Sequence, residues 1–405
     1  MSATAVLDGR AREGRAVRLR IWSAAWPIAA VFVLANAATP LYVLWQAEFG
    51  FSKSTLTAVF CCYMAGMGLS LLVSGVVSDR LGRKAVLVPA LILAIAAGLI
   101  FAAAPGTLAL FIARTIVGIA SGAMVSAGVA AVTDIAGPAH TRSAAVAGAV
   151  GIAVGTGLGP LLGGVLSETL PGPTVTVFLV ETVFLLVALA IVVIVPIPRA
   201  GAERGDAWIR VPRVPQPNRR QLLVAVTVAG SALTTTAFML SLAPSLLSEL
   251  LGTTNRIVAG AVACLTFAVA TASQFALRGL PVRRLLLASV LSTVVCVVVL
   301  VVAVDTSSVA GLVVAAALAG GAYGPGMLGG LALLNSDIPV GRLAEANAAL
   351  NIGAYALAGL MILGLGFISD RFGFATGVTL FAALAAVMAL TGGALVRSGL
   401  RPVGE

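Results

Sequence analysis

The sequence predicts an all-α membrane protein with twelve transmembrane helices, and three observations carry this prediction. Hydrophobic residues make up 60% of the 405 residues and charged residues only 10%, far below the roughly 25% charged residues of soluble domains. Apolar runs with the length of a spanning helix, about 20 residues, recur along the whole chain. One long polar segment, residues 197–220, divides these runs six and six. We therefore expect two six-helix bundles joined by a linker.

Six apolar runs precede this linker and six follow it. We place the spans at Ile21–Trp45, Leu56–Ser78, Ala85–Ala104, Leu108–Thr133, Ala144–Ser167, Val175–Val195, Gln221–Leu247, Ile257–Leu277, Leu285–Val304, Val309–Leu334, Leu343–Ile368 and Phe374–Leu395. The chain then divides into a tail at 1–20, bundles at 21–196 and 221–396, and a second tail at 397–405. Because the number of spans is even, both tails lie on one side of the membrane.

Basic residues are distributed unequally between the two sides of this topology. The tails, the linker and the loops on their side hold 21 of the 25 Lys and Arg residues, and the opposite side holds only Lys53, Arg256 and Arg371. Loops rich in Lys and Arg stay in the cytoplasm. We therefore expect a multi-pass protein of the inner (cytoplasmic) membrane with both termini cytoplasmic. The net charge of +10 is then explained by topology and by attraction to the lipid bilayer, and we expect no nucleic acid partner.

Reactive and metal-binding side chains are scarce. The single histidine, His140, lies in a loop, and the four cysteines lie in spans without a Cys-x-x-Cys pair. A metal site needs several such ligands, and a membrane-embedded enzyme, a remote alternative, needs clustered His, Asp or Glu. We expect no metal, no cofactor and no enzyme. The sequence also has no Gly-x-x-x-x-Gly-Lys-Ser/Thr loop, so ATP does not drive the protein directly.

A glycine-punctuated, charged hairpin separates the second and third spans. Its sequence is Gly75-Val-Val-Ser-Asp79-Arg80-Leu-Gly82-Arg83-Lys84. It resembles the G-x-L-x-D-R-x-G-R-[KR] signature of major facilitator superfamily transporters, with Val77 in place of the usual Leu. The resemblance covers essentially all twelve spans. It implies the major facilitator fold, in which the two six-helix bundles are pseudo-symmetric.

This resemblance gives the hairpin a gating role. It implies that Asp79 forms a charge cluster with Arg83 and Asp134, and that Asp79 also faces the start of the eleventh span. Contacts that break and re-form between the bundles would make a two-state gate, whereas the alternative is a loop that only sets topology. The expected gating residues are Gly75, Asp79, Arg80, Gly82, Arg83, Asp134, Arg342 and Glu345.

The fifth span carries a second signature, Gly155-x-x-x-Gly159-Pro160-x-x-Gly163-Gly164. A proline inside a helix removes a backbone donor and kinks the helix, and glycines let another helix approach closely. We expect that neighbour to be the eighth span. The segment resembles the superfamily's antiporter motif, which marks proton-coupled exporters more than uptake systems. Ordinary packing of small residues is the alternative.

Two ionisable side chains lie deep in the first bundle. Arg114 shares one face of the fourth span with Gly118 and Gly122, and this pattern resembles one that drug–proton antiporters use in proton transfer. Glu181 is the one carboxylate clearly inside a span. Because ionisable residues inside a membrane are functional candidates, we expect Arg114 and Glu181 to couple protons. Snorkelling of Arg114 and a structural hydrogen bond of Glu181 are the alternatives.

Polar and aromatic residues in the spans are candidates for a substrate cavity. They are Asn36, Tyr42, Thr235, Phe238, Tyr323, Asn347, Asn351 and Tyr355. The resemblance places spans one, four, seven and ten around a central cavity, and helix–helix hydrogen bonding is the alternative. These features predict a monomeric secondary active transporter that exports small organic molecules, drugs or metabolites, in exchange for protons. A proton-coupled importer of a small metabolite on the same fold is the alternative.

Overall fold

The computed structural model describes residues 3–198, 215–249, 252, 255–336, 338–339 and 342–399, and these residues form helices and turns but no strand. Twelve helical spans in the described chain are long and apolar enough to cross a membrane. The predicted all-α architecture with twelve spans is thereby confirmed.

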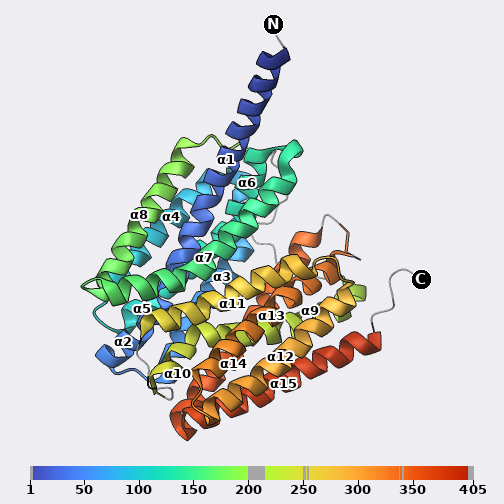
Figure 1. Ribbon diagram of the computed structural model, residues 1–405. Helices are drawn as coiled ribbons and strands as arrows, with labels where there is room; N and C mark the ends of the chain where they lie inside the picture. The colour runs from blue at the N-terminus through green and yellow to red at the C-terminus, as the bar shows by residue number, and fades with distance from the viewer. Residues whose placement is uncertain are drawn as a thin grey trace.

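Six spans form the first bundle (Figure 1). The first span comprises α1 (Ala3–Ala37), η1 (Thr39–Leu41) and α2 (Tyr42–Phe49), and the second and third are α3 (Lys53–Leu81) and α4 (Arg83–Ala102). The fourth comprises α5 (Thr107–Ala123), a π-helical turn η2 (Met124–Gly128) and α6 (Val129–Ala136). The fifth is η3 (Pro138–His140) with α7 (Thr141–Thr169), and the sixth is α8 (Pro173–Ile194).

The second bundle repeats this order of spans. Its helices are η4 (Gln216–Asn218) with α9 (Arg219–Ser241), α10 (Ala243–Glu249), α11 (Arg256–Leu277), α12 (Val282–Asp305), α13 (Val309–Asn335), α14 (Leu343–Phe372) and α15 (Phe374–Gly399). All except the short α10 belong to spans seven to twelve. The second span of each bundle is therefore α3 or α11, and the fifth is α7 or α14.

Local sequence explains where these helices begin and end. Ser52 and Asn255 accept hydrogen bonds from backbone N–H groups in the first turns of α3 and α11, which satisfies donors that a helix start leaves unpaired. Gly82 and Gly373 end α3 and α14 with φ of 95° and 88°, in a backbone region that favours glycine. Leu108, Ile194 and Leu360 are at least 70% exposed, as expected for side chains that face lipid.

Helix begins before the predicted first residue of each bundle. α1 begins at Ala3, so residues expected in a polar tail continue the first span as helix. Ala, Arg and Leu are strong helix formers, and they dominate this segment, which has no proline before Pro27. The predicted linker at 197–220 lies mostly outside the described residues, and its last part forms η4 and the start of α9.

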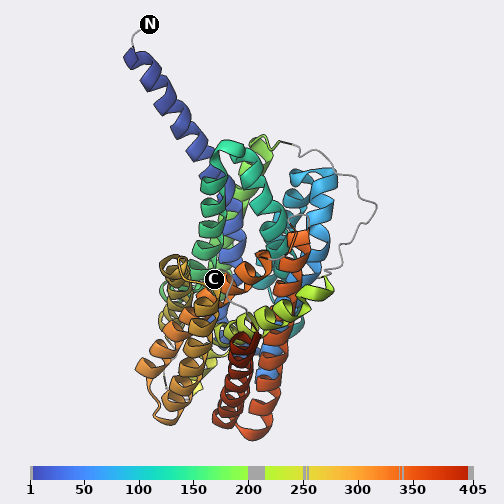
Figure 2. The same cartoon turned by 90° about the vertical axis from the view of Figure 1, so that its right-hand side faces the viewer.

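The bundles touch mainly through two helix pairs, α7 with α11 and α3 with α14, which we call the two seams. Figure 1 shows the bundles together at the ends that carry α2, α5 and α10, and diverging towards the ends from which the chain termini extend. Figure 2 shows the first bundle, blue to green, above the second, yellow to red. We call the end that carries α2, α5 and α10 the far end. The end from which the chain termini extend is called the terminal end.

Candidate functional site

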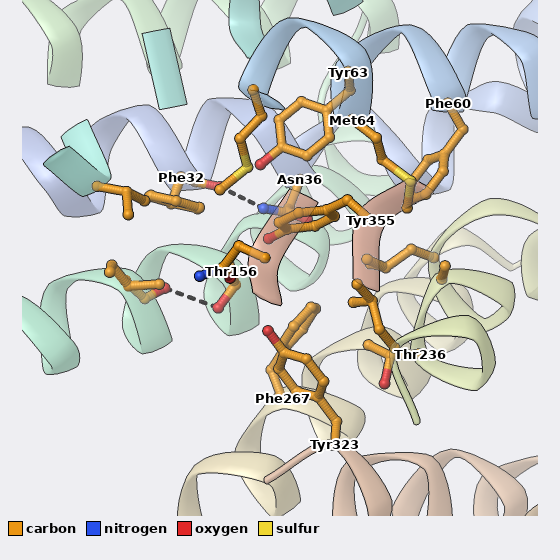
Figure 3. Close-up of a pocket in the computed structure, with 17 residues that line it drawn as sticks. Phe32, Asn36, Phe60, Tyr63, Met64, Thr156, Thr236, Phe267, Tyr323 and Tyr355 are labelled. Atoms are coloured by element: carbon orange, nitrogen blue, oxygen red, sulfur yellow. Dashed lines mark hydrogen bonds between the residues drawn. The ribbon is translucent and has the colours of Figure 1, made fainter. Parts of the chain in front are cut away.

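A cavity of about 180 Å³ lies between the two bundles. α1, α3, η2 and α7 line it from the first bundle, and α9, α11, α13 and α14 line it from the second. Figure 3 draws its 17 lining residues, which include six aromatic side chains and two methionines but no charged residue. The cavity is therefore an apolar, aromatic space that both bundles complete.

Polar groups reach this cavity from both sides. The Nδ2 atoms of Asn36 and Asn351 donate to the carbonyl oxygens of Phe32 and Asn347, each at 2.8 Å, which leaves both amide oxygens free to accept. Tyr323 projects into the cavity from α13 (Figure 3), and within the described chain its hydroxyl has no hydrogen-bond partner. The lining therefore offers acceptors and a donor to a bound molecule without offering a charge.

Arg114 lies behind two of the aromatic rings that line the cavity. It is 1% exposed; its Nε donates to the Tyr42 hydroxyl, and its Nη1 donates to the Ala35 carbonyl at 2.5 Å. The guanidinium carbon lies 5.8 Å from the centre of the Tyr63 ring and 5.9 Å from that of Phe60, and such contacts stabilise a cation. The charge is held inside the bundle and does not snorkel to its surface.

Close packing against α3 fixes the position of Arg114. A Cβ on Gly118 or Gly122 would collide with the carbonyl oxygen of Tyr63 or Met67, respectively. Only glycine lets two helix backbones approach this closely. Nη2 of the guanidinium has no partner in the described residues, so Arg114 retains an unused nitrogen with two N–H donors in a dry environment.

Glu181 on α8 is fully buried, and neither carboxyl oxygen has a hydrogen-bond partner among the described residues. It makes no ion pair with Arg114 in this conformation. Aromatic rings lie between Glu181 and Arg114. Phe178 is one turn before Glu181 on α8, and the centre of its ring lies 4.9 Å from that of Phe101. The centre of the Phe101 ring lies 5.9 Å from the Arg114 guanidinium carbon. A buried carboxylate without a partner is costly, and binding a proton removes most of that cost.

The hairpin between α3 and α4 forms a charge cluster within the first bundle. Arg83 Nη1 lies 2.6 Å from an oxygen of Asp79, and Arg83 Nε lies 2.7 Å from an oxygen of Asp134. In the second bundle, Arg342 pairs with Glu345 at 3.6 Å. In the described chain no hydrogen bond or ion pair joins these two groups, so the expected contact between Asp79 and the start of α14 is not made in this conformation.

Three further hairpin residues lie near the end of α3. Gly82 supplies the positive φ that ends α3, and Arg80 is half-buried next to Asp79. Gly75, one turn before Asp79, has no atom within 4 Å of the position that a Cβ would take. Space is therefore open beside the α3 backbone at the terminal end.

The glycines of the fifth span divide between two faces of α7. A Cβ on Gly155, Gly159 or Gly163 would collide with backbone or side-chain atoms of α1, within the same bundle. A Cβ on Gly164 would instead meet the Arg256 carbonyl at the start of α11, and Gly260 of α11 sits against the Pro160 carbonyl. The expected contact with the eighth span is made by Gly164 and Pro160, because helical periodicity turns the other three glycines towards α1.

Four of the eight expected cavity residues line the cavity, and four do not. Asn36, Tyr323, Asn351 and Tyr355 line it. The Tyr42 hydroxyl accepts a hydrogen bond from Arg114, and the Thr235 hydroxyl donates to the Ala232 carbonyl at 2.8 Å. The Phe238 ring stacks on that of Phe381, with 5.5 Å between the ring centres. The Asn347 carbonyl accepts a hydrogen bond from the Asn351 side chain. On α9 it is Thr236, the residue after Thr235, that lines the cavity. Successive residues of a helix point in different directions, so Thr235 faces away from it.

Sequence reasoning missed lining residues on α3, α7 and α11. They include Phe60, Tyr63, Met64, Thr156 and Phe267. Tyr63 and Thr156 are a tyrosine and a threonine inside apolar spans, which is a usable signal. They lie on the second and fifth spans, whereas the expected cavity residues come from spans one, seven, ten and eleven.

The sequence profile of the Major Facilitator Superfamily matches residues 22–362, and no curated protein sequence gives a significant match. The solved structure of the POT family transporter PepTSo has a TM-score of 0.78 at 12% identity, over 95% of this chain and 98% of that one. An inward-facing, unoccupied bacterial homolog to the human lysosomal transporter Spinster has a TM-score of 0.73 at 14% identity, over 94% and 96%. A D-xylose-proton symporter has a TM-score of 0.70 at 15% identity, over 93% and 96%.

Proposed function

The chain belongs to the Major Facilitator Superfamily, and on that premise we propose that it is a proton-coupled secondary active transporter that exports small organic molecules. Its family and fold are those of transporters, and its twelve spans make it a multi-pass membrane protein. One observation carries the proposal: a cavity completed by both bundles lies between helix pairs that meet at the far end. A molecule bound there would be released to the other side when the bundles rock about it.

The chemistry of the lining supports an uncharged or anionic aromatic substrate. Flat rings gain from stacking against aromatic side chains, and Asn36, Asn351 and Tyr323 supply a few directional hydrogen bonds. A cation would lose hydration without meeting a carboxylate in the lining, and the Arg114 guanidinium behind Phe60 and Tyr63 would repel it.

The geometry of α7 supports export. Pro160 and Gly164 of the antiporter-like segment lie in the seam with α11, so a change in this segment would alter the contact between bundles. The open space beside Gly75 supports an inner gate, since the start of α14 can occupy it when the terminal end closes. Asp79 would then face the N-terminus of α14, where a carboxylate is favoured.

Proton coupling is assigned to Glu181 and Arg114. Within the described chain, the buried Glu181 carboxyl has no partner and the Arg114 Nη2 keeps its two N–H donors unused, and the Phe101–Phe178 stack lies between their regions. In the alternate conformation the guanidinium would stabilise the ionised carboxylate and drive proton release. In the present one the carboxyl is best accommodated with a proton bound.

Everted membrane vesicles with an acidified lumen test the direction and the coupling. We expect the protein to accumulate a neutral phenolic or nitroaromatic probe in the lumen, and to leave a dicationic dye of similar size outside. Accumulation of the neutral probe in right-side-out vesicles with an acidic exterior would show import instead.

The variants Glu181→Gln and Arg114→Ala test the proton route. We expect Glu181→Gln to bind the probe but to lose its pH-driven accumulation, and Arg114→Ala to lose pH-driven transport altogether. Normal accumulation ratios in Glu181→Gln would place the coupling carboxyl elsewhere.

The proposed orientation puts both termini and the terminal end in the cytoplasm. Gly279→Cys, in the loop between α11 and α12, and Thr306→Cys, after α12, lie at opposite ends of that helix. In a background without native cysteines, an impermeant thiol reagent applied to intact cells should label position 306 and not position 279. The reverse pattern contradicts the orientation.

A further inference from the structure

A carboxylate of the second bundle holds the start of α3 at the far end. The two oxygens of Asp370, near the end of α14, accept hydrogen bonds from the backbone N–H groups of Lys53 and Ser54, each at 2.9 Å. These are donors that the first turn of a helix leaves unpaired, at the positive end of its dipole. The contact ties α14 of one bundle to α3 of the other.

A second carboxylate bridges the other seam, where its partner is a side chain and not the backbone. Glu168, near the end of α7, accepts a hydrogen bond from Arg256 Nε at 2.6 Å, and Arg256 Nη2 donates to the Ser167 carbonyl at 2.8 Å. Arg256 is the first residue of α11. This contact therefore ties α7 of the first bundle to α11 of the second.

The two contacts occupy the same place in the two halves of the fold. α7 and α14 are the fifth spans of their bundles, and α3 and α11 are the second spans. In each seam an acid at the end of a fifth span holds the first residue of a second span, and that residue is basic, Lys53 or Arg256. The residue before it, Ser52 or Asn255, caps its helix in both cases.

A short sequence pattern accompanies each contact. The fifth spans contain Gly164-Val-Leu-Ser167-Glu168 and Gly366-Phe-Ile-Ser369-Asp370, so the order Gly-x-x-Ser-acid occurs at the same place in both bundles. A Cβ on Gly164 would meet the Arg256 carbonyl, and a Cβ on Gly366 would lie 2.9 Å from the Lys53 carbonyl. In each copy the glycine lets the start of the partner helix approach, one turn before the acid that binds that start, through the backbone N–H groups of Lys53 and Ser54 or through the side chain of Arg256.

An ion pair adds a further contact to the α3 seam. The Lys53 Nζ lies 2.8 Å from a Glu249 oxygen on α10 and 5.0 Å from the centre of the Phe374 ring. Side chains of all these pairs are partly exposed, with Arg256 at 20% and Glu168 at 32%. Water competes for such contacts, so each is weak enough to break without a large cost in free energy.

We propose that the two Gly-x-x-Ser-acid segments form a twofold-related latch, in which Asp370 and Glu168 hold the far end closed and must both release before it opens. They are positioning residues for the transport cycle and bind no substrate. The inference rests on the alternating access in the proposed function. It assigns the far end two matched carboxylates, whereas the hairpin supplies Asp79 to the terminal end.

Spin labels across the far end test the latch without any substrate. Leu108→Cys and Thr306→Cys, exposed on opposite bundles, are labelled in a chain whose four native cysteines are serines, and their distance is measured by double electron–electron resonance. We expect Asp370→Asn and Glu168→Gln each to raise the population of the longer distance. The double variant should shift the ratio of open to closed by about fivefold or more.

Matched variants separate a latch from a general loss of charge or of fold. Glu48→Gln removes an exposed carboxylate at the same end and should leave the distances unchanged. Exchanging the pair as Glu168→Arg with Arg256→Glu should restore the short distance that either single exchange loses. A double Asp370→Asn and Glu168→Gln variant with the wild-type distribution would overturn the proposal. Because the distances need no substrate, this outcome is distinct from failure to find export.

Discussion

The two ends of the α3–α14 seam carry pentapeptides that share the pattern Ser-Asp-Arg-x-Gly but lie in two different situations. Ser78-Asp79-Arg80-Leu81-Gly82 ends α3 at the terminal end, and Ser369-Asp370-Arg371-Phe372-Gly373 ends α14 at the far end. In both, the final glycine has a positive φ, and its N–H donates to the serine carbonyl, at 3.0 and 3.1 Å. Asp79 nevertheless pairs with Arg83 in its own bundle, whereas Asp370 binds the first turn of α3 in the other.

The difference shows that local sequence sets the shape of the turn but not the partner of the acid. α3 and α14 are antiparallel, so each aspartate lies near the N-terminus of the other helix when that end is closed. Only the far end is closed here. The pentapeptide at the terminal end keeps its charge within the first bundle, through Arg83 and Asp134, until the bundles meet. A conformational exchange of this kind needs only a few kcal/mol of bias.

Asp79→Asn is expected to have the largest effect on this comparison. The variant cannot place a charge on the start of α14, so the closed terminal end loses a charge-assisted contact of roughly 1.5–3 kcal/mol. Transport should fall about tenfold or more, and labels at the far end should report fewer open molecules. Transport at the wild-type rate, in protein that folds and inserts normally, would remove Asp79 from the gate.

Gly366→Ala should disturb the opposite end. Its Cβ would lie 2.8 Å from the Ser54 Cα, and overpacking of this kind costs about 1–3 kcal/mol. We expect a lower thermal midpoint and a larger open population at the far end. Gly364→Ala, on the same helix with no atom within 4 Å of the new Cβ, is the matched control and should change neither value. Equal results for the two variants would argue against tight closure at Gly366.

Gly75→Ala should separate stability from transport. In the present conformation the added methyl meets nothing within 4 Å, and alanine favours a helix interior over glycine by up to about 1 kcal/mol. The thermal midpoint should therefore stay level or rise. Transport should fall severalfold, because the methyl occupies the space into which the start of α14 moves. An unchanged transport rate would show that α14 does not approach Gly75.

Tyr323→Phe is expected to have the smallest effect and tests the cavity apart from the ends. Loss of one hydroxyl donor should weaken probe binding by about 0.5–1.5 kcal/mol, seen as a higher KM at nearly constant maximal rate. The distances at both ends should remain those of the wild type. A shift in these distances would mean that the cavity residue acts in gating.

Much of the fold follows from local properties of the chain. Hydropathy and run length predicted all twelve spans, since any helix that crosses a bilayer must be apolar over about 20 residues. Gly82 and Gly373 end their helices in one and the same way because a positive φ is available to glycine at little cost. Helical spacing also grouped Arg114 with Gly118 and Gly122 correctly on the face that packs against α3.

The candidate site was less accessible to such reasoning. The cavity is lined by four of the expected residues, Asn36, Tyr323, Asn351 and Tyr355, but not by Thr235 or Phe238. Rotating α9 about its axis by one residue would change which of its side chains face the cavity. Tyr63 enters the cavity from a span that was not expected to line it. The relative rotation of packed helices depends on all their neighbours together, so it is not written in any one span.

The sequence by itself determined the number of spans and their order, since these depend on interactions within a few residues. Only the tertiary structure decided which of the two Ser-Asp-Arg-x-Gly pentapeptides reaches across the bundles, and which glycines of α7 face α1 or α11. The Gly-x-x-Ser-acid segments were visible in the chain, but their pairing with Lys53 and Arg256 joins residues more than 80 positions apart. Contacts over such separations depend on how two bundles meet, which no local pattern specifies.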